Sequence, residues 1–472
     1  MSIDPRIAHL APALEEIAAS NGRAPTFMRT DYGNAERLVS AHGGDLRYAH
    51  GLGWLAWDGR RWRRDLDGEV ERRAKATVRA LYREAGSLED EGERKALASW
   101  ARKSEAAPRI AAAIALARTE SAVVVGPGAL DGAPLLLNVV NGTLDLRTGE
   151  LREHRREDLL TKLAPVAWVP GSRDPAWERF LEHTTGGDAE LAAFLQRAAG
   201  YTLTGDTGEE VLFFAHGPTA TGKSTLLEAL GATLGEYAVT ADFDTFLARR
   251  GDPGVRTDIA RLAGARLVAS LEVEDGKRLA EGLLKQLTGG DTVTARFLYS
   301  NAFEFAPAFK LWLAANARPR VSADDAAIWR RIVQVPFVET VPAAERDPGL
   351  KRHLKDDPGA RSAILAWALE GALAWQQHGL GVPERVRDYT ADYRRENDPL
   401  AEWLEMYCAF GEDLTVRAAD LRASYEAWAE ANGERPISAR AWGEALRARG
   451  CERQRVQRER VWAGVGLEER DR

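Results

Sequence analysis

The sequence predicts an α/β protein with a parallel sheet in its central domain, a mixed α+β domain before it and a small winged-helix domain after it. Three observations support this prediction. Strands alternate with helices from residue 211 to about 342, a glycine-rich stretch at 217–224 follows the first of these strands, and three helical patterns with a hairpin follow residue 399. We therefore expect domains at residues 1–169, 170–380 and 381–472.

Length and composition limit the possible classes of protein. A chain of 472 residues is too long for one compact core. No apolar stretch is long enough to cross a bilayer, the N-terminus lacks a secretory signal, and only two cysteines are present, so we expect a protein of the bacterial cytoplasm without a membrane partner. The net charge of −7 argues against a nucleic-acid coat over the whole surface but permits a local basic patch.

The N-terminal part contains two predicted strand units and a helical region. Aromatic runs around Asp58-Gly59 predict a hairpin near residues 54–62, and a turn at Asn141-Gly142 predicts a second unit over 135–146. Helical patterns occupy about 70–117, and a linker rich in Pro and Gly near 165–175 marks the expected boundary.

The glycine-rich stretch has the spacing of a phosphate-binding loop. It follows an apolar strand at 211–215 and precedes a helix that ends at Gly235, which is the context such a loop requires. Backbone N–H groups would bind the phosphates of ATP, Lys223 would reach the outer phosphates, and Ser224 would hold Mg²⁺. The predicted ATP-binding residues are Gly217, Pro218, Thr219, Ala220, Thr221, Gly222, Lys223, Ser224 and Thr225.

Further candidates for catalysis follow later strands. Glu272 and Glu274 follow the strand at 266–271 on one face, so that one could hold Mg²⁺ and the other orient water; we place Glu272 in the metal site, although the sequence leaves the division of roles open. Asn316 follows the strand at 310–315 and is suited to hydrogen-bond the γ-phosphate. Arg330 and Arg331 are the candidates for an arginine finger, and the choice between them is also open.

Two regions are candidates for contact with DNA. The segment 292–305 has the pattern of a hairpin, in which Arg296, Phe297 and Tyr299 could grip a single strand, or the aromatics could serve a core. The tail carries an excess of arginine over acidic residues in its last helix and hairpin, which favours DNA binding over a merely solvated face. Its candidates are Arg447, Arg449, Arg453 and Arg455.

Taken in order, these motifs resemble those of the superfamily 3 helicases, particularly the primase-helicases of satellite phages, plasmids and poxviruses. The resemblance includes Thr288-Gly289-Gly290-Asp291 and extends to segments near residues 30–37, 141–145 and 395–399. It implies an AAA+-like motor that assembles as a hexameric ring and translocates 3′ to 5′ on single-stranded and forked DNA. An arginine of 330–331 would then act in trans, the hairpin would line the pore, and a separate primase or polymerase would be a partner.

The resemblance has one departure, because the N-terminal part contains no zinc-type Cys/His cluster and no paired acids suited to polymerising nucleotides. Primer synthesis is therefore not expected. Two rival interpretations keep the same phosphate chemistry: an ATPase that remodels or loads proteins, and an initiator that binds a defined duplex without separating its strands.

Overall fold

The computed structural model describes residues 27–248, 257–271, 277–296, 302–323, 325–398, 400–432, 436–456 and 459–468. The chain divides into two compact units. The first comprises Met1–Asp58 with Trp62–Leu130, and the second comprises Gly59–Arg61 with Asp131–Arg472. The first division therefore falls at Leu130 and not at residue 169, the expected boundary.

In its described residues, from 27 onward, the first unit combines a small sheet with four α-helices. Its sheet has the order β3-β2-β1-β4, and the predicted hairpin near residues 54–62 is present as the antiparallel pair of β2 and β3. Within its core, the buried amide of Asn34 donates to the Ser104 hydroxyl at 3.0 Å and accepts from the Trp100 indole at 3.1 Å, which ties the first helix to the third. The elements are β1 (Leu46–Ala49), β2 (Gly53–Trp57), β3 (Trp62–Arg64), β4 (Val124–Val125), α2 (Asp31–His42), α3 (Glu69–Ser87), α4 (Glu91–Ser104) and α5 (Ala107–Ala117).

The second unit begins with a three-stranded meander of β5 (Leu136–Val139), β6 (Gly142–Asp145) and β7 (Glu150–Arg152). The predicted turn at Asn141-Gly142 joins β5 to β6. Leu137, Val139 and Leu144 are fully buried in the same core cluster as the central sheet. This shared core is the physical reason why the meander belongs to the second unit, since a linker-based boundary ignores long-range packing.

The central sheet of the second unit has five parallel strands in the order β14-β8-β13-β10-β9. The strands expected at 211–215, 266–271 and 310–315 and the one after Arg331 are all present. Their nearly continuous apolar residues fit a sheet that is buried on both faces. The strands are β8 (Leu212–His216), β9 (Ala238–Thr240), β10 (Leu267–Leu271), β13 (Lys310–Ala315) and β14 (Ile332–Pro336).

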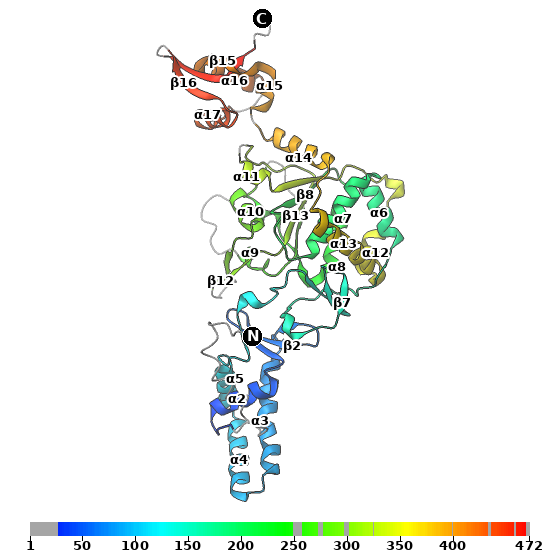
Figure 1. Cartoon of the computed structure of the whole chain (residues 1–472), viewed down its shortest axis with the longest axis vertical. Coiled ribbons are helices and arrows are strands. Elements are labelled where there is room, and N and C mark those ends of the chain that lie inside the picture. The colour runs from blue at the N-terminus through cyan, green and yellow to red at the C-terminus, as the bar shows by residue number, and fades with distance from the viewer. Residues whose placement is uncertain are drawn as a thin grey trace, which may run out of the picture. The chain divides into compact units, whose positions relative to one another are not determined.

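Alternation along the strands divides the core between the two faces of the sheet, which Figure 1 shows among its helices. Phe213 and Trp312 face one cluster, with residues of α6, α7, α8, α12 and α13, whereas Phe214 and Leu313 face the other, with residues of α9, α10, α11 and α14. The first set of helices is α6 (Pro175–Thr185), α7 (Ala189–Leu203), α8 (Lys223–Leu234), α12 (Leu350–Asp356) and α13 (Pro358–His378). The second set is α9 (Thr257–Ala260), α10 (Glu281–Thr288), α11 (Ala326–Trp329) and α14 (Glu384–Glu396). The predicted hairpin at 292–305 is present as β11 (Val293–Arg296) and β12 (Ala302–Phe305).

The C-terminal part has its own core around the fully buried Trp403, Tyr425 and Trp462. The three expected helices and the hairpin are present, and a further strand, β15, completes a sheet of order β15-β17-β16. The elements are α15 (Ala401–Tyr407), β15 (Cys408–Arg417), α16 (Ala418–Ala431), α17 (Ala439–Ala448), β16 (Glu452–Val456) and β17 (Glu459–Leu467).

Candidate functional site

The candidate site lies at the carboxyl edge of the central sheet. His216, the last residue of β8, stands in register with Ala315 of β13 on one side and Pro336 of β14 on the other. The loop that starts at Gly217 and the side chain of Asn316 therefore leave the sheet at the same edge. Ligands of open parallel sheets bind outside the carboxyl ends of the strands, so this is the edge at which a nucleotide would be expected.

The loop between β8 and α8 passes close to its neighbours at two glycines. A Cβ at Gly217 would lie 1.8 Å from the Phe337 carbonyl oxygen, and a Cβ at Gly222 would lie 2.8 Å from both the Phe180 ring and the Thr184 hydroxyl oxygen. Gly222 also has a φ of +94°. Only glycine fits these two positions without displacing backbone or ring atoms. Between them, residues 218–220 are exposed and Thr221 is buried.

Lys223 is the first residue of α8, and its side chain bonds back to carbonyl groups of the preceding loop. Its ammonium group donates to the carbonyl oxygens of Gly217 at 2.7 Å and Pro218 at 2.6 Å, and burial lowers its pKa. The side chains of Ser224 and Thr225 follow in the first turn, which has no side-chain cap and no acidic residue. The N–H groups of this turn and the positive end of the helix dipole therefore face the loop, and the turn itself supplies no anion to neutralise them.

His216 lies beside these groups and is held by α14. Its Nδ1 is 2.8 Å from the Tyr389 hydroxyl. Desolvation, followed by the charges of Arg318 and Lys223, lowers the pKa of His216 to about 4, so the ring is neutral at pH 7. Asn316 is exposed at the same edge. The structure thus brings together the predicted Lys223 and Asn316, and adds His216 and Tyr389.

Sequence reasoning did not find His216 or Tyr389. A histidine that ends an apolar strand directly before the first glycine of the loop is a signal that could have indicated His216. Tyr389 had no comparable signal, because it lies 173 residues farther along the chain on a helix assigned to the tail domain.

Several predicted residues fall outside the described residues, namely Glu272, Glu274, Phe297 and Tyr299. The strand before the two acids is described: β10 ends at Leu271, in register with Ala314, and so ends at the same edge of the sheet as the loop. Arg296 is the last described residue of β11, where it is exposed and stands opposite Ala302.

Arg330 and Arg331 lie at the opposite, amino edge of the sheet. The N–H of Leu212, at the start of β8, donates to the carbonyl oxygen of Arg331 at 2.7 Å. Both guanidinium groups contact Glu210, at 3.1 Å from Arg330 and 2.8 Å from Arg331, but the Arg330 side chain is 64% exposed and that of Arg331 only 9%. The five residues of β8 separate this edge from the loop by roughly 16 Å.

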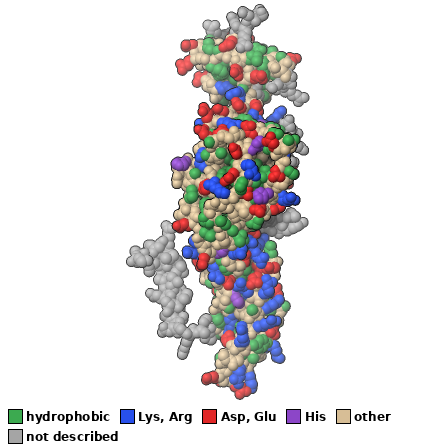
Figure 2. Space-filling view, turned by 90° about the vertical axis from the view of Figure 1, so that its right-hand side faces the viewer, with side chains coloured by type: hydrophobic (Ala, Val, Ile, Leu, Met, Phe, Trp, Pro, Cys, Tyr) green, Lys and Arg blue, Asp and Glu red, His purple; other side chains and the backbone are tan. Residues whose placement is uncertain are grey.

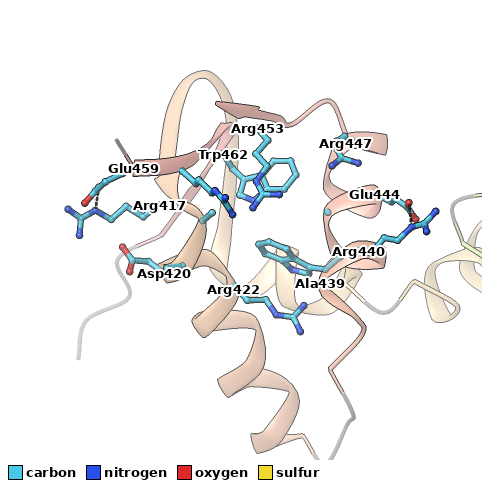
Figure 3. A pocket seen from close by; sticks show the side chains of 15 residues that line it. Arg417, Asp420, Arg422, Ala439, Arg440, Glu444, Arg447, Arg453, Glu459 and Trp462 are labelled. Carbon is cyan, nitrogen blue, oxygen red and sulfur yellow. Dashed lines mark hydrogen bonds and ion pairs between the residues drawn. The ribbon is translucent and has the colours of Figure 1, made fainter. Parts of the chain in front are cut away.

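The four predicted arginines of the tail have different surroundings. Arg447 and Arg453 line one cavity of about 880 Å³, with Arg447 on α17 and Arg453 on β16 (Figure 3). Arg449 is instead bound to the Asp398 carboxylate and donates to the Ala445 carbonyl oxygen at 2.7 Å. Arg455 is exposed on β16 and is not among the lining residues.

The rest of the visible surface carries charges of both signs. On the face drawn in Figure 2, Lys and Arg side chains are mixed with Asp and Glu side chains. Such a mixture agrees with the small net charge of −7, so a binding site for a polyanion is expected to be a local basic patch and not this whole face. Within the part of the chain that the structure describes, no helix is long and apolar enough to cross a membrane.

Comparison with known proteins gives two matches to families. Residues 35–186 match the family described as "D5 N terminal like", and residues 215–331 match a family of unknown function (DUF5906). The chain is 25% identical over 324 residues to "Putative helicase L207/L206" of Acanthamoeba polyphaga mimivirus and 26% identical over 397 residues to "Putative helicase 022R" of Frog virus 3 (isolate Goorha). These matches cover 64% and 67% of this chain, but only 34% and 41% of the two relatives.

Among solved structures, the C-terminal region of NrS-1 in its apo A form resembles the chain with a TM-score of 0.45 at 12% identity, covering 74% of this chain and 87% of that one. A shorter apo structure of the same region, residues 305–718, gives a TM-score of 0.39 at 11% identity and covers 64% of this chain and 77% of that one.

The chain therefore combines a parallel α/β fold with similarity, over part of their length, to two viral proteins named as putative helicases. The chain thus resembles the primase-helicase type of superfamily 3 helicase that its motifs indicated, through a D5-like segment at residues 35–186 and two viral relatives named as putative helicases.

Proposed function

We propose that the protein is an ATP-dependent DNA helicase of a phage, prophage or plasmid replication system, which moves 3′ to 5′ on single-stranded DNA as a ring, expected to be a hexamer. The observation that carries this proposal is the loop between Gly217 and Gly222. Its two glycines leave no room for a side chain, and its lysine lies beside an uncapped helix N-terminus at the carboxyl edge of the sheet. This arrangement is suited to a triphosphate.

The residues present fit an ATP–Mg²⁺ complex, although Glu272 and Glu274 lie outside the described residues. Lys223 would exchange its bonds to loop carbonyls for the outer phosphates, and Asn316 would hydrogen-bond the terminal phosphate or the attacking water. Ser224 and Glu272 would hold Mg²⁺, which neutralises phosphate charge when bound. His216, kept neutral by its surroundings, can donate or accept a hydrogen bond at this edge without adding charge.

The position of the paired arginines supports a motor made of several subunits. Because Arg330 and Arg331 lie roughly 16 Å from the loop of their own chain, an arginine finger at this position would serve the nucleotide of a neighbouring copy. A closed ring supplies such a neighbour to every subunit. Arg330, which is largely exposed, is better placed for this role than the buried Arg331.

The C-terminal part is proposed to be a winged-helix domain that binds DNA. Its three helices, with the last one followed by a two-stranded ribbon, support this proposal. The hairpin of β11 and β12 is proposed to contact the single strand in the pore, with Arg296, Phe297 and Tyr299 as the candidate residues.

The test is ATP-dependent strand displacement on forked DNA with defined 3′ and 5′ tails. We expect unwinding that requires a 3′ tail and disappears in Lys223→Ala. Lys95→Ala, which removes an exposed lysine paired with Glu91 on the same helix, is the matched control and should unwind like the wild type. DNA-stimulated ATP hydrolysis without strand displacement would instead indicate a loader or an initiator.

A further inference from the structure

We infer that the cavity of the C-terminal domain is a binding groove for the phosphate backbone of double-stranded DNA, with Arg447, Arg453 and Arg460 as its ligand-contacting residues. This inference rests on the proposed function in taking DNA as the ligand. It differs from the sequence-based prediction, which included Arg449 and Arg455 and did not include Arg460.

The lining of the groove is strongly basic. Six arginines and three carboxylates line it, in a chain whose net charge is −7. Two of the carboxylates are already paired, Glu459 with Arg417 at 2.7 Å and Glu444 with Arg440 at 3.0 Å, and the third is Asp420 (Figure 3). The groove therefore keeps an excess of positive charge after its internal pairs are formed.

A third arginine of the lining, Arg422, is engaged in contacts within the domain. Arg422 pairs with Glu426 at 2.6 Å, donates to the Ile437 carbonyl oxygen at 2.8 Å, and lies 5.5 Å from the ring centre of Trp442. The remaining three are exposed, and among the described residues the structure gives none of them an ion pair: Arg447, Arg453 and Arg460. Figure 3 shows Arg447 and Arg453 on different elements, α17 and β16, with Trp462 between them.

The ribbon of β16 and β17 places arginines close together, where their like charges repel. Arg455 of β16 stands directly opposite Arg460 of β17, and Arg453 lies two residues before Arg455 on the same strand. Because side chains alternate along a strand, Arg453 and Arg455 lie on one face of the ribbon together with Arg460. Like charges directly opposite each other destabilise a sheet, so this concentration of arginines is better explained by an external polyanion than by folding.

The aromatic residues of the groove indicate which form of DNA it accepts. Trp442 and Trp462 are 4% and 2% exposed and pack edge to face at 5.9 Å. Their rings are used by the core and offer no free face on which a base could stack. Proteins that bind single strands rely on such stacking, whereas a duplex presents a dense double row of phosphates to a basic groove. The groove supplies charge without stacking and therefore fits the duplex.

The test compares the full chain with Arg447→Gln/Arg453→Gln in binding a labelled blunt duplex of 20 base pairs, and the corresponding single strand, without nucleotide. We expect the Kd for the duplex to rise about eightfold for each arginine–phosphate pair that a substitution removes at 0.1 M salt, or roughly 60-fold for the double variant. The slope of the logarithm of the binding constant against the logarithm of the salt concentration should become less negative by about two. Arg460→Gln should by itself raise the Kd for the duplex about eightfold, which on a logarithmic scale is half of the effect of the double variant.

The matched control is Arg79→Gln/Arg83→Gln, which removes the same charge from an exposed face of α3 in the other compact unit and should leave the Kd for the duplex unchanged. Equal melting temperatures of the variants will show that the exposed substitutions leave the fold intact. Unchanged affinity and salt dependence in the groove variant would overturn the inference, as would a weakening confined to the single strand.

Failure of this inference can be distinguished from failure of the proposed function. A wild type that binds duplex through these arginines but hydrolyses no ATP would refute the motor and keep the groove. A wild type that unwinds forked DNA, with a duplex affinity that does not depend on Arg447, Arg453 and Arg460, would refute the groove and keep the motor.

Discussion

Lys223 and Lys310 lie at opposite edges of the same parallel sheet, and their surroundings differ. Lys223, at the carboxyl edge, bonds to the loop that it belongs to, beside the exposed residues 218–220. Lys310, at the amino edge, is fully buried and donates to the carbonyl oxygens of Thr204 at 2.6 Å and Asp206 at 2.9 Å. Its ammonium group also lies 4.5 Å from the ring centre of Tyr201, and burial lowers its pKa strongly.

The end of α7 explains why the amino edge tolerates buried cations. This helix ends at Leu203, whose carbonyl oxygen accepts a hydrogen bond from the buried Arg266 at 2.6 Å, and the carbonyl that Lys310 contacts follows directly. Carbonyl groups at the end of a helix carry partial negative charge, so both cations complete a helix terminus. A lysine therefore indicates a ligand site only where its partners can be exchanged for a ligand, which is the case for Lys223 and not for Lys310.

The largest effect is expected for the arginines at the amino edge, if they complete the site of a neighbouring copy. Arg330→Ala should reduce ATP hydrolysis about a thousandfold because it removes the charge that a finger supplies. Its stability should change little, since the side chain is 64% exposed. Mixing Arg330→Ala with Lys223→Ala subunits should restore part of the activity, because mixed interfaces combine an intact loop with an intact arginine. Steady-state ATPase assays at concentrations that support ring assembly will measure this.

Two results would count against that assignment. Full activity in Arg330→Ala would exclude Arg330 as the finger, and inactive mixtures of the two variants would exclude action between subunits. Arg331→Ala is the contrasting variant: its side chain is buried and bonds both Glu210 and the Ala327 carbonyl oxygen, so its removal should lower the free energy of unfolding by about 1–3 kcal/mol.

The next effect sharpens the contrast between the two lysines. Lys310→Ala should lower the free energy of unfolding by about 2–4 kcal/mol, because it leaves a cavity and removes the donor of buried carbonyl groups. Lys310→Met, which fills the volume, should be destabilised less. Lys223→Ala should also lose less stability than Lys310→Ala, because Pro218, whose carbonyl oxygen Lys223 contacts, is exposed to water. Urea unfolding followed by tryptophan fluorescence will compare the three. An unchanged midpoint for Lys310→Ala would show that the amino-edge lysine is not structural.

The local parts of the site could be predicted from the sequence. The strand, the glycine-rich loop and the helix ending at Gly235 are consecutive, so Lys223 and its neighbours are positioned by residues within a few turns of them. Asn316 could be predicted because it directly follows an apolar strand, and parallel strands end at a common edge.

Other features depend on interactions between distant residues and could not be predicted. Arg330 precedes β14 whereas the loop follows β8, so the parallel pairing of these two neighbouring strands, which is a long-range interaction, places Arg330 far from its own loop. Arg449 is tied to Asp398, 51 residues earlier in the chain, which removes it from the groove. The meander of β5 to β7 joins the second unit through its buried leucines, although the linker composition favours a later boundary.

The smallest effect concerns the pH dependence of the carboxyl edge. The folded pKa of His216, about 4, is below the unfolded value of about 6.5, because burial and the charges of Arg318 and Lys223 disfavour the proton. The unfolded chain therefore takes up this proton first as the pH falls, and stability that is present above pH 6.5 is lost between pH 6.5 and 4. One such proton changes the free energy of unfolding by at most about 1.4 kcal/mol per pH unit, and by less here because water screens a partly exposed ring.

His216→Gln, which can still bond the Tyr389 hydroxyl, should show a shallower fall in melting temperature between about pH 7 and pH 5 than the wild type. Parallel curves for the two proteins would mean that His216 takes up its proton as readily in the folded chain as in the unfolded one, and that Lys223 and Arg318 do not exert the repulsion that their positions imply.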